Sequence, residues 1–150
     1  MTYNADFTNG PSTNGTSPSK EKMYFKLTQL TPDIIRSQIT TLTNNFDPSL
    51  NLNKDFIDQL LHTLDNRTND DPSLYRGFLN TPANDINGDI MKQVIGKNGC
   101  YFHMTTINTG ALFIWHDRKS HKIFVWGEKF PTINSLKILS QRINKYTINP

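Results

Sequence analysis

VIGKNGCYF, residues 94–102, places two glycines three positions apart, with an apolar run before them and two aromatic residues after them. A surface hairpin needs only one such glycine, so the second glycine and the lysine require their own explanation. Gly96 stands where a preceding helix is expected to end, because glycine readily takes the left-handed conformation found after helices. If a second helix starts after Gly99, its free N–H groups form an anion site beside the charge of Lys97. The stretch therefore predicts either an ordinary connector between helices or a clamp for a phosphodiester backbone.

The segments around this loop alternate between strand and helix patterns. Strand character is found in LYRGFLN (74–80), and apolar residues at helical spacing in NDINGDIMKQVI (84–95). Two aromatic and β-branched strands with the spacing of a hairpin follow in ALFIWH (111–116) and KIFVWG (122–127). A last helix is predicted over residues 130–146, with Ile133, Leu136, Leu139 or Ile138, Ile143 and Tyr146 on one face.

One segment of this half is ambiguous. CYFHMTTINT (100–109) contains threonines and an isoleucine that favour a strand. Its position between the glycine loop and the next strand favours a short helix instead. Both readings stay open at this point.

The first half of the chain has a different organisation. Residues 1–22 are mostly Asn, Gly, Ser, Thr and Pro, which is typical of a flexible tail. Apolar residues at helical spacing predict two helices, over residues 31–46 and 53–66. We therefore expect a tail, then a helical extension over residues 23–72, then a domain over residues 73–150.

The composition indicates a soluble chain. Its 150 residues are 35% hydrophobic, enough for one domain with a real core. The single cysteine, Cys100, excludes an internal disulfide framework and any multi-cysteine zinc site. No apolar run approaches the roughly 18 residues that span a bilayer, and the first residues lack the layout of a signal peptide. We expect an intracellular protein, in the cytoplasm or nucleus, with no membrane partner.

Positive charge is concentrated in the second half of the chain. Residues 1–72 carry 6 Lys or Arg against 9 Asp or Glu, a net charge of −3. Residues 73–150 carry 10 against 4, a net charge of +6. Such asymmetry is typical of proteins that contact nucleic acid, and it also occurs on solvated basic faces.

The order strand, helix, Gly-Lys-Asn-Gly, helix, strand, basic loop, strand, helix resembles the type I KH (K homology) domain over residues 74–146. The resemblance lies in INGDIMKQVIGKNG (86–99), in Gly110 and Ala111, in Gly127, and in KIFVWGEKFPTINSLKILSQRI (122–143). It implies an α+β fold of order βααββα, with a three-stranded antiparallel sheet packed on three helices. It also implies binding of about four nucleotides of single-stranded RNA or DNA, clamped by the G-x-x-G loop.

Position by position, the resemblance implies a nucleic-acid site with four parts. The backbone clamp would be Gly96, Lys97, Asn98 and Gly99. The apolar floor under the bases would be Ile86, Ile90, Val94, Ile95 and Phe102. The strand beside the bases would contribute Leu112, Phe113 and Ile114. The variable loop would add Arg118, Lys119 and Lys122.

The two hairpin strands predict a covered sheet face. In the KH pattern, the side chains that face the helices are Phe113, Trp115, Ile123 and Val125, because alternate residues share a face. The other face then carries Leu112, Ile114, Phe124 and Trp126. Together these exceed the roughly 300–600 Å² of the largest apolar patch on a typical monomer. We expect this interaction face to be covered, either by the N-terminal helices of the same chain or by a second copy in a homodimer.

No catalytic, cofactor or metal site is expected. The histidines at positions 62, 103, 116 and 121 have no metal-ligand spacing with Cys100, and no Ser/His/Asp or Cys/His arrangement stands out. The expected function is single-stranded nucleic-acid binding, with RNA preferred over DNA. The alternative is a structural or protein–protein interaction protein on a degenerate KH scaffold, and Leu112 favours it because many members carry a base-reading Arg or Lys there. The 17 asparagines indicate AT-rich coding, under which that protein would be a packaged viral protein located in the virion.

Overall fold

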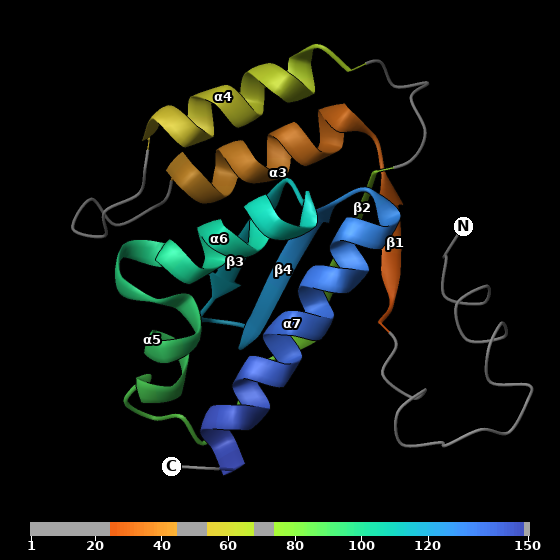
Figure 1. Ribbon diagram of the computed structural model, residues 1–150. Helices are drawn as coiled ribbons and strands as arrows, with labels where there is room; N and C mark the ends of the chain where they lie inside the picture. Colours follow the sequence, from red (N-terminus) through yellow and green to blue (C-terminus); the bar gives the residue numbers. More distant parts are fainter. Residues whose placement is uncertain (1–24, 45–53, 68–73, 149–150) are drawn as a thin grey trace, which may run out of the picture.

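The computed structural model describes residues 25–44, 54–67 and 74–148 (Figure 1). These residues form an α+β structure around a four-stranded antiparallel sheet with the order β1-β2-β4-β3. The strands are β1 (Leu27–Leu30), β2 (Leu74–Asn80), β3 (Phe113–Asp117) and β4 (Lys122–Gly127). The tail expected over residues 1–22 lies outside the described residues.

Three helices, α5 (Asp89–Ile95), α6 (Cys100–Thr109) and α7 (Lys129–Ile148), pack together on one face of the sheet (Figure 1). A short 3₁₀ turn, η2 (Lys97–Gly99), joins α5 to α6. The apolar face predicted for the last helix is confirmed, since α7 buries four of those residues against the sheet: Ile133, Leu136, Leu139 and Ile143. The apolar spacing of α7 therefore sets how it lies across β2 and β4.

The opposite face of the sheet is covered by α3 (Pro32–Asn44) and α4 (Lys54–Asp65), which lie side by side (Figure 1). Their apolar residues form a second core with Leu74, Phe113 and Trp126 of the sheet. The indole Nε1–H of Trp126 also donates a hydrogen bond to Oε1 of Gln38 at 2.8 Å. The expected cover over this face is thus supplied by the same chain, and the sheet is the middle one of three layers.

The alternation of side chains in β3 is opposite to the predicted one. The register pairs Phe113 with Trp126 and Ile114 with Val125, and directly opposed residues share a face. Phe113 therefore points toward α3 and α4, whereas Ile114 is buried in the core beneath α5, α6 and α7.

Two further predicted positions follow from this register. Trp115, predicted to face α5–α7, packs instead against the core formed with α3 and α4. Leu112, just before the strand, packs against that same core, as expected. The prediction that Ile114 belongs to the interaction face was thus wrong, because a shift of one residue exchanges the two faces of a strand.

Helix α5 begins at Asp89, five residues later than predicted. The carboxylate of Asp85 accepts hydrogen bonds from the backbone N–H groups of Ile90 and Met91, each at 3.0 Å. These bonds satisfy donors that the first turn of a helix leaves without partners. Ile86 therefore lies in a turn rather than on the predicted helix, and it is 90% exposed.

Strand β1 was not predicted at all. Its four residues, LTQL, show no long alternation, yet they pair antiparallel with β2 along one edge of the sheet. Leu27 is fully buried there, opposite Gly77. A Cβ atom at Gly77 would lie 2.6 Å from Leu136 Cδ1 and 2.7 Å from Leu27 Cδ2. Because Gly77 has no side chain, Leu27 of β1 and Leu136 of α7 can both pack closely against β2. With β1 included, the sheet has four strands rather than the expected three.

The ambiguous segment 100–109 is the helix α6. It buries Thr105 and Thr106, whose hydroxyl groups donate to the backbone carbonyls of Tyr101 (2.7 Å) and His103 (2.6 Å). A threonine whose hydroxyl is bonded to its own helix can be buried without an unpaired polar group. Three large apolar side chains are exposed instead, namely Tyr101, Met104 and Ile107.

Across residues 25–44, 54–67 and 74–148, the helices are all too short or too polar to cross a membrane.

Candidate nucleic-acid interface

The Gly-Lys-Asn-Gly loop turns the chain from α5 into α6 through three residues with positive φ. These are Gly96 (φ 83°), Asn98 (φ 57°) and Gly99 (φ 77°). The N–H of Gly96 donates to the carbonyl of Lys92 at 2.9 Å, and the N–H of Gly99 donates to the carbonyl of Gly96 at 3.0 Å. Both hydrogen bonds keep the turn tight. The side chains of Lys97 and Asn98 are exposed at its tip.

The two glycines of the loop have different roles. A Cβ atom at Gly96 would lie 2.6 Å from Tyr101 Cδ2 and 2.8 Å from Cys100 Sγ. The Gly96 backbone, with ψ 164°, also lies in a region that essentially only glycine occupies. Around Gly99 no described atom lies within 4 Å of such a Cβ, and its left-handed conformation is the sole constraint. Gly96 therefore allows the close contact of the loop with Tyr101, whereas Gly99 leaves open space beside the start of α6.

This difference predicts unequal effects of a single methyl group. Gly96→Ala is expected to lower the free energy of unfolding by about 2–4 kcal/mol, from backbone strain and overpacking against Tyr101. Gly99→Ala, the matched control, should cost only about 1–2 kcal/mol of left-handed strain. Urea denaturation of both variants measures the difference. Equal losses would contradict the close packing at Gly96.

Arg142, near the C-terminal end of the chain, contacts the residues on both sides of this loop. The Arg142 Nη1 atom, on α7, donates to the carbonyl of Val94 at 3.5 Å. Its guanidinium carbon lies 5.2 Å from the ring centroid of Tyr101, the residue that packs against Gly96. Arg142 thus places a positive charge beside the clamp. No local pattern could predict it, because more than forty residues separate Arg142 from the loop.

The apolar floor predicted under the bases consists largely of core residues. Val94 and Phe102 are buried within the core that α5 and α6 share with the sheet. Ile90 and Ile95 are half-buried at the edge of that core. Ile95 therefore adjoins the loop and Ile90 lies in the first turn of α5, both as partly accessible apolar side chains, and Ile86 lies outside the group.

The strand residues predicted to contact bases are also covered. Phe113 and Ile114 are buried on opposite faces of the sheet, and Leu112 is half-buried toward α3 and α4. This part of the sequence-based site is therefore core rather than accessible surface.

The basic loop between β3 and β4 is accessible. The carboxylate of Asp117 accepts hydrogen bonds from the backbone N–H of Lys119 (3.2 Å) and from the hydroxyl of Ser120 (2.8 Å). The turn so formed exposes Arg118 and Lys119. Lys122 is half-buried, with its ammonium nitrogen 5.2 Å from the ring centroid of Phe78. Arg118 and Lys119 can reach a ligand in solution, whereas Lys122 lies along the sheet.

His116 of β3 adds no positive charge to this basic loop at pH 7. Burial lowers the pKa of His116, and the neighbouring positive charge of Arg118 lowers this pKa further, against a smaller opposite effect of Asp117. His116 is therefore neutral at pH 7 in the folded chain. Because the unfolded chain binds this proton more readily, the contribution of His116 to folding stability falls as the pH drops below about 6.5.

Within the described part of the chain, no three His, Cys, Asp or Glu side chains come together in a way that could hold a metal ion. No protein-family model, curated protein or solved structure matches the sequence. The function has to follow from the chemistry of the residues themselves.

Proposed function

We propose that this chain binds single-stranded nucleic acid by clamping the phosphodiester backbone at the Gly-Lys-Asn-Gly loop. The geometry of that loop carries the proposal, because it exposes Lys97 and Asn98 while the glycines form the turn. Helix α6 starts at Cys100, whose own N–H donates to the carbonyl of Lys97, and the next N–H groups of a helix's first turn have no acceptors within it. A phosphate beside Gly99 would meet these groups without a side chain in the way.

The order of the elements supports a type I KH domain over residues 74–146. The succession β2, α5, α6, β3, β4, α7 has the order βααββα expected for that family. Strands β2, β4 and β3 are antiparallel neighbours, with α5, α6 and α7 on one face (Figure 1). Strand β1 and helices α3 and α4 would then be additions to the family fold, and the resemblance favours RNA over DNA as the ligand.

Positive charge and partly accessible apolar groups gather around the loop. Lys97 is exposed at its tip, and Arg142 lies beside it on α7. Tyr101 is 43% exposed, and Ile90 and Ile95 are half-buried. These side chains give the bases of a clamped strand apolar contacts, while the cations pair with phosphates.

The clamp is tested by replacing Lys97 and Asn98 together by Asp. Both glycines remain, so the turn and the ends of both helices should persist, and exposed substitutions usually change stability by no more than about 0.5 kcal/mol. The loop's charge changes by −3, and carboxylates then face the phosphates. We expect affinity for single-stranded oligonucleotides of mixed sequence to fall at least tenfold, about 1.4 kcal/mol, in fluorescence anisotropy.

A matched control separates the clamp from overall charge. Asn134 and Lys137 are exposed on α7, and replacing both by Asp also changes the charge by −3. This control should lose much less affinity, and both variants should melt at the parent's temperature. If the two double variants bind equally well, the Gly-Lys-Asn-Gly loop is a connector. Equal affinity for duplex and single strands would indicate nonspecific charge instead of a clamp.

The exposed face of α6 favours the alternative function, a protein–protein interaction on a degenerate KH scaffold. Tyr101, Met104 and Ile107 follow one another at near-helical spacing and are all exposed. Exposed apolar patches of this kind mark interaction sites in many proteins. Under this alternative, the clamp double variant binds oligonucleotides no differently from its control.

A further inference from the structure

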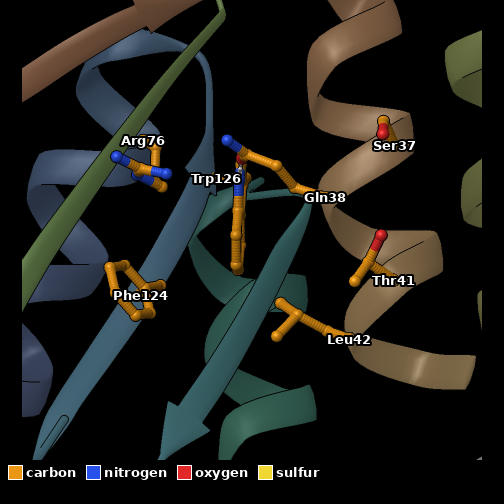
Figure 2. A pocket seen from close by; sticks show the side chains of 7 residues that line it. All are labelled: Ser37, Gln38, Thr41, Leu42, Arg76, Phe124 and Trp126. Atoms are coloured by element: carbon orange, nitrogen blue, oxygen red, sulfur yellow. Dashed lines mark hydrogen bonds between the residues drawn. The ribbon is translucent and has the colours of Figure 1, made fainter. Parts of the chain in front are cut away.

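A cavity of about 300 Å³ opens between α3 and the sheet, on the face opposite to α5, α6 and α7 (Figure 2). Its volume is at the lower end of the range for small-molecule sites, roughly 300–1,000 Å³. Phe124 and Trp126 of β4 line it from the sheet, and Arg76 of β2 lies beside them. Ser37, Gln38 and Thr41 line it from α3. None of these residues belongs to the clamp.

The sheet side of the cavity is aromatic and held in place. The ring centroids of Phe124 and Trp126 lie 6.0 Å apart. The hydrogen bond from the Trp126 indole occupies Oε1 of Gln38 and so fixes the amide group of that residue. The amide N–H₂ of Gln38 then has no acceptor among the described residues. A planar ring on Phe124 would find a π-face below it and hydrogen-bond donors at its edge.

Arg76 gives the cavity its charge. Its guanidinium carbon lies 5.5 Å from the ring centroid of Phe124. The ion pairs between described residues do not include Arg76, although its side chain is half-buried. Arginine binds phosphate through two parallel hydrogen bonds. A half-buried arginine that lacks an ion-pair partner in the described part of the chain thus favours an anionic ligand.

Helix α3 adds two hydroxyl groups. Ser37 and Thr41 are four residues apart, which places them on successive turns on the same side of the helix (Figure 2). Neither hydroxyl has a hydrogen-bond partner within the described residues. Both can donate to and accept from the edge of a base or a sugar.

We infer that this cavity binds one nucleotide unit, a planar base carrying a phosphate. The base stacks on Phe124 and meets the Gln38 amide and the α3 hydroxyls at its edge, while the phosphate pairs with Arg76. The site requires aromatic, cationic and hydroxyl groups together, and the cavity provides all three. It does not depend on the proposed clamp, which lies on the other face of the sheet.

The unit can come from a free mononucleotide or from a strand. Phe78 lies next to Phe124, with ring centroids 6.2 Å apart, and the ammonium of Lys122 is 5.2 Å from the Phe78 centroid. This second pair of ring and cation continues the same chemistry along the sheet. A strand would use it for a neighbouring nucleotide, whereas a mononucleotide would not.

The site is tested by titrating the full-length ¹⁵N-labelled chain with adenosine 5′-monophosphate and following the indole N–H signal of Trp126, assigned with Trp126→Phe. A saturable shift of this signal is expected. Adenosine should bind at least fivefold more weakly, because it lacks the phosphate. Inorganic phosphate, which lacks the ring, should leave the indole signal in place. An indole signal that does not move with the monophosphate overturns the proposal.

Variants locate the binding. Arg76→Gln should weaken binding of the monophosphate at least tenfold, whereas Lys137→Gln, which removes an exposed cation on α7 outside the cavity, should not change it. Thr41→Phe fills the cavity from an exposed position on α3, so it abolishes binding without removing a core residue. If Thr41→Phe binds as the parent does, or if the two glutamine variants have equal affinity, the site is not this cavity.

Two more titrations distinguish a free mononucleotide from a strand, and the cavity from the clamp. If the nucleotide belongs to a strand, the trinucleotide of adenosine should move the Trp126 signal at a concentration at least fivefold lower than the monophosphate. Equal concentrations identify a mononucleotide site. The clamp double variant at Lys97 and Asn98 should leave the monophosphate titration unchanged. Loss of oligonucleotide binding in that variant, with the Trp126 shift retained, supports both sites independently, and loss of the Trp126 shift overturns the cavity as a separate site.

Discussion

Deletion of residues 1–70, which removes β1, α3 and α4, is expected to make the remaining chain aggregate or self-associate. The deletion uncovers Phe113, Phe124 and Trp126, and aromatic side chains each bury roughly 150–250 Å² when covered. This is more apolar surface than the roughly 300–600 Å² patch of a typical monomer. The deletion also turns β2 into a sheet edge whose backbone groups are free to pair with another chain.

Analytical ultracentrifugation and tryptophan emission measure this effect against the full chain. We expect larger sedimenting species, and an emission that stays blue-shifted because association buries Trp115 and Trp126 again. A truncated chain that sediments as a monomer, with its two tryptophans emitting as solvated indoles, would show that the cover is dispensable. The residues of the clamp are all retained in this truncation, so oligonucleotide binding by any monomeric fraction tests whether the clamp needs the α3–α4 layer.

Trp126→Ala is expected to lower the free energy of unfolding by about 3–5 kcal/mol. The Trp126 side chain is 2% exposed, with its ring centroid 5.7 Å from that of Phe113, and it joins the sheet to α3 through Gln38. Its removal leaves a cavity between two layers and an amide oxygen without its donor. Urea denaturation followed by circular dichroism measures the loss.

Two further variants bracket this prediction. Trp126→Phe keeps most of the ring packing but loses the indole donor, so it should cost about 1–3 kcal/mol. Ile34→Ala, on α3 but 45% exposed, should stay within about 0.5 kcal/mol of the parent. A loss below about 1.5 kcal/mol for Trp126→Ala would mean that α3 is not docked through this residue.

The elements with strong local periodicity were predictable from the sequence. The helices α3, α4 and α7 occur within two residues of where their apolar spacing placed them, and so do β2, β3 and β4. The turn at Gly96 is also a local matter, because glycine is required wherever φ is positive and a neighbour approaches closely. These features depend on residues within a few positions of one another.

The remaining features depend on contacts between residues far apart in the chain. Strand β1 exists because β2 offers it an edge and Gly77 leaves room for Leu27, which four residues with little alternation cannot indicate. The face of β3 depends on its register with β4, and a one-residue shift would exchange Phe113 and Ile114. Helix α6 buries threonines because their hydroxyls bond to its own carbonyls, so its apolar pattern misidentifies the buried face.

The candidate sites divide in the same way. The clamp is one continuous loop, so its residues were evident in the sequence, whereas Val94 and Phe102 of the floor assigned to it were buried once the layers had packed. The other parts of the sites come from separate elements of the fold. Arg142 of α7 lies beside the loop, and Arg76 of β2 and Gln38 of α3 line the cavity on the opposite face of the sheet. Apolar periodicity tells which residues avoid water, but it does not tell which partner covers them. The packing of α3, α4 and α7 on the sheet makes that selection, and so it also sets which polar groups remain accessible to a ligand.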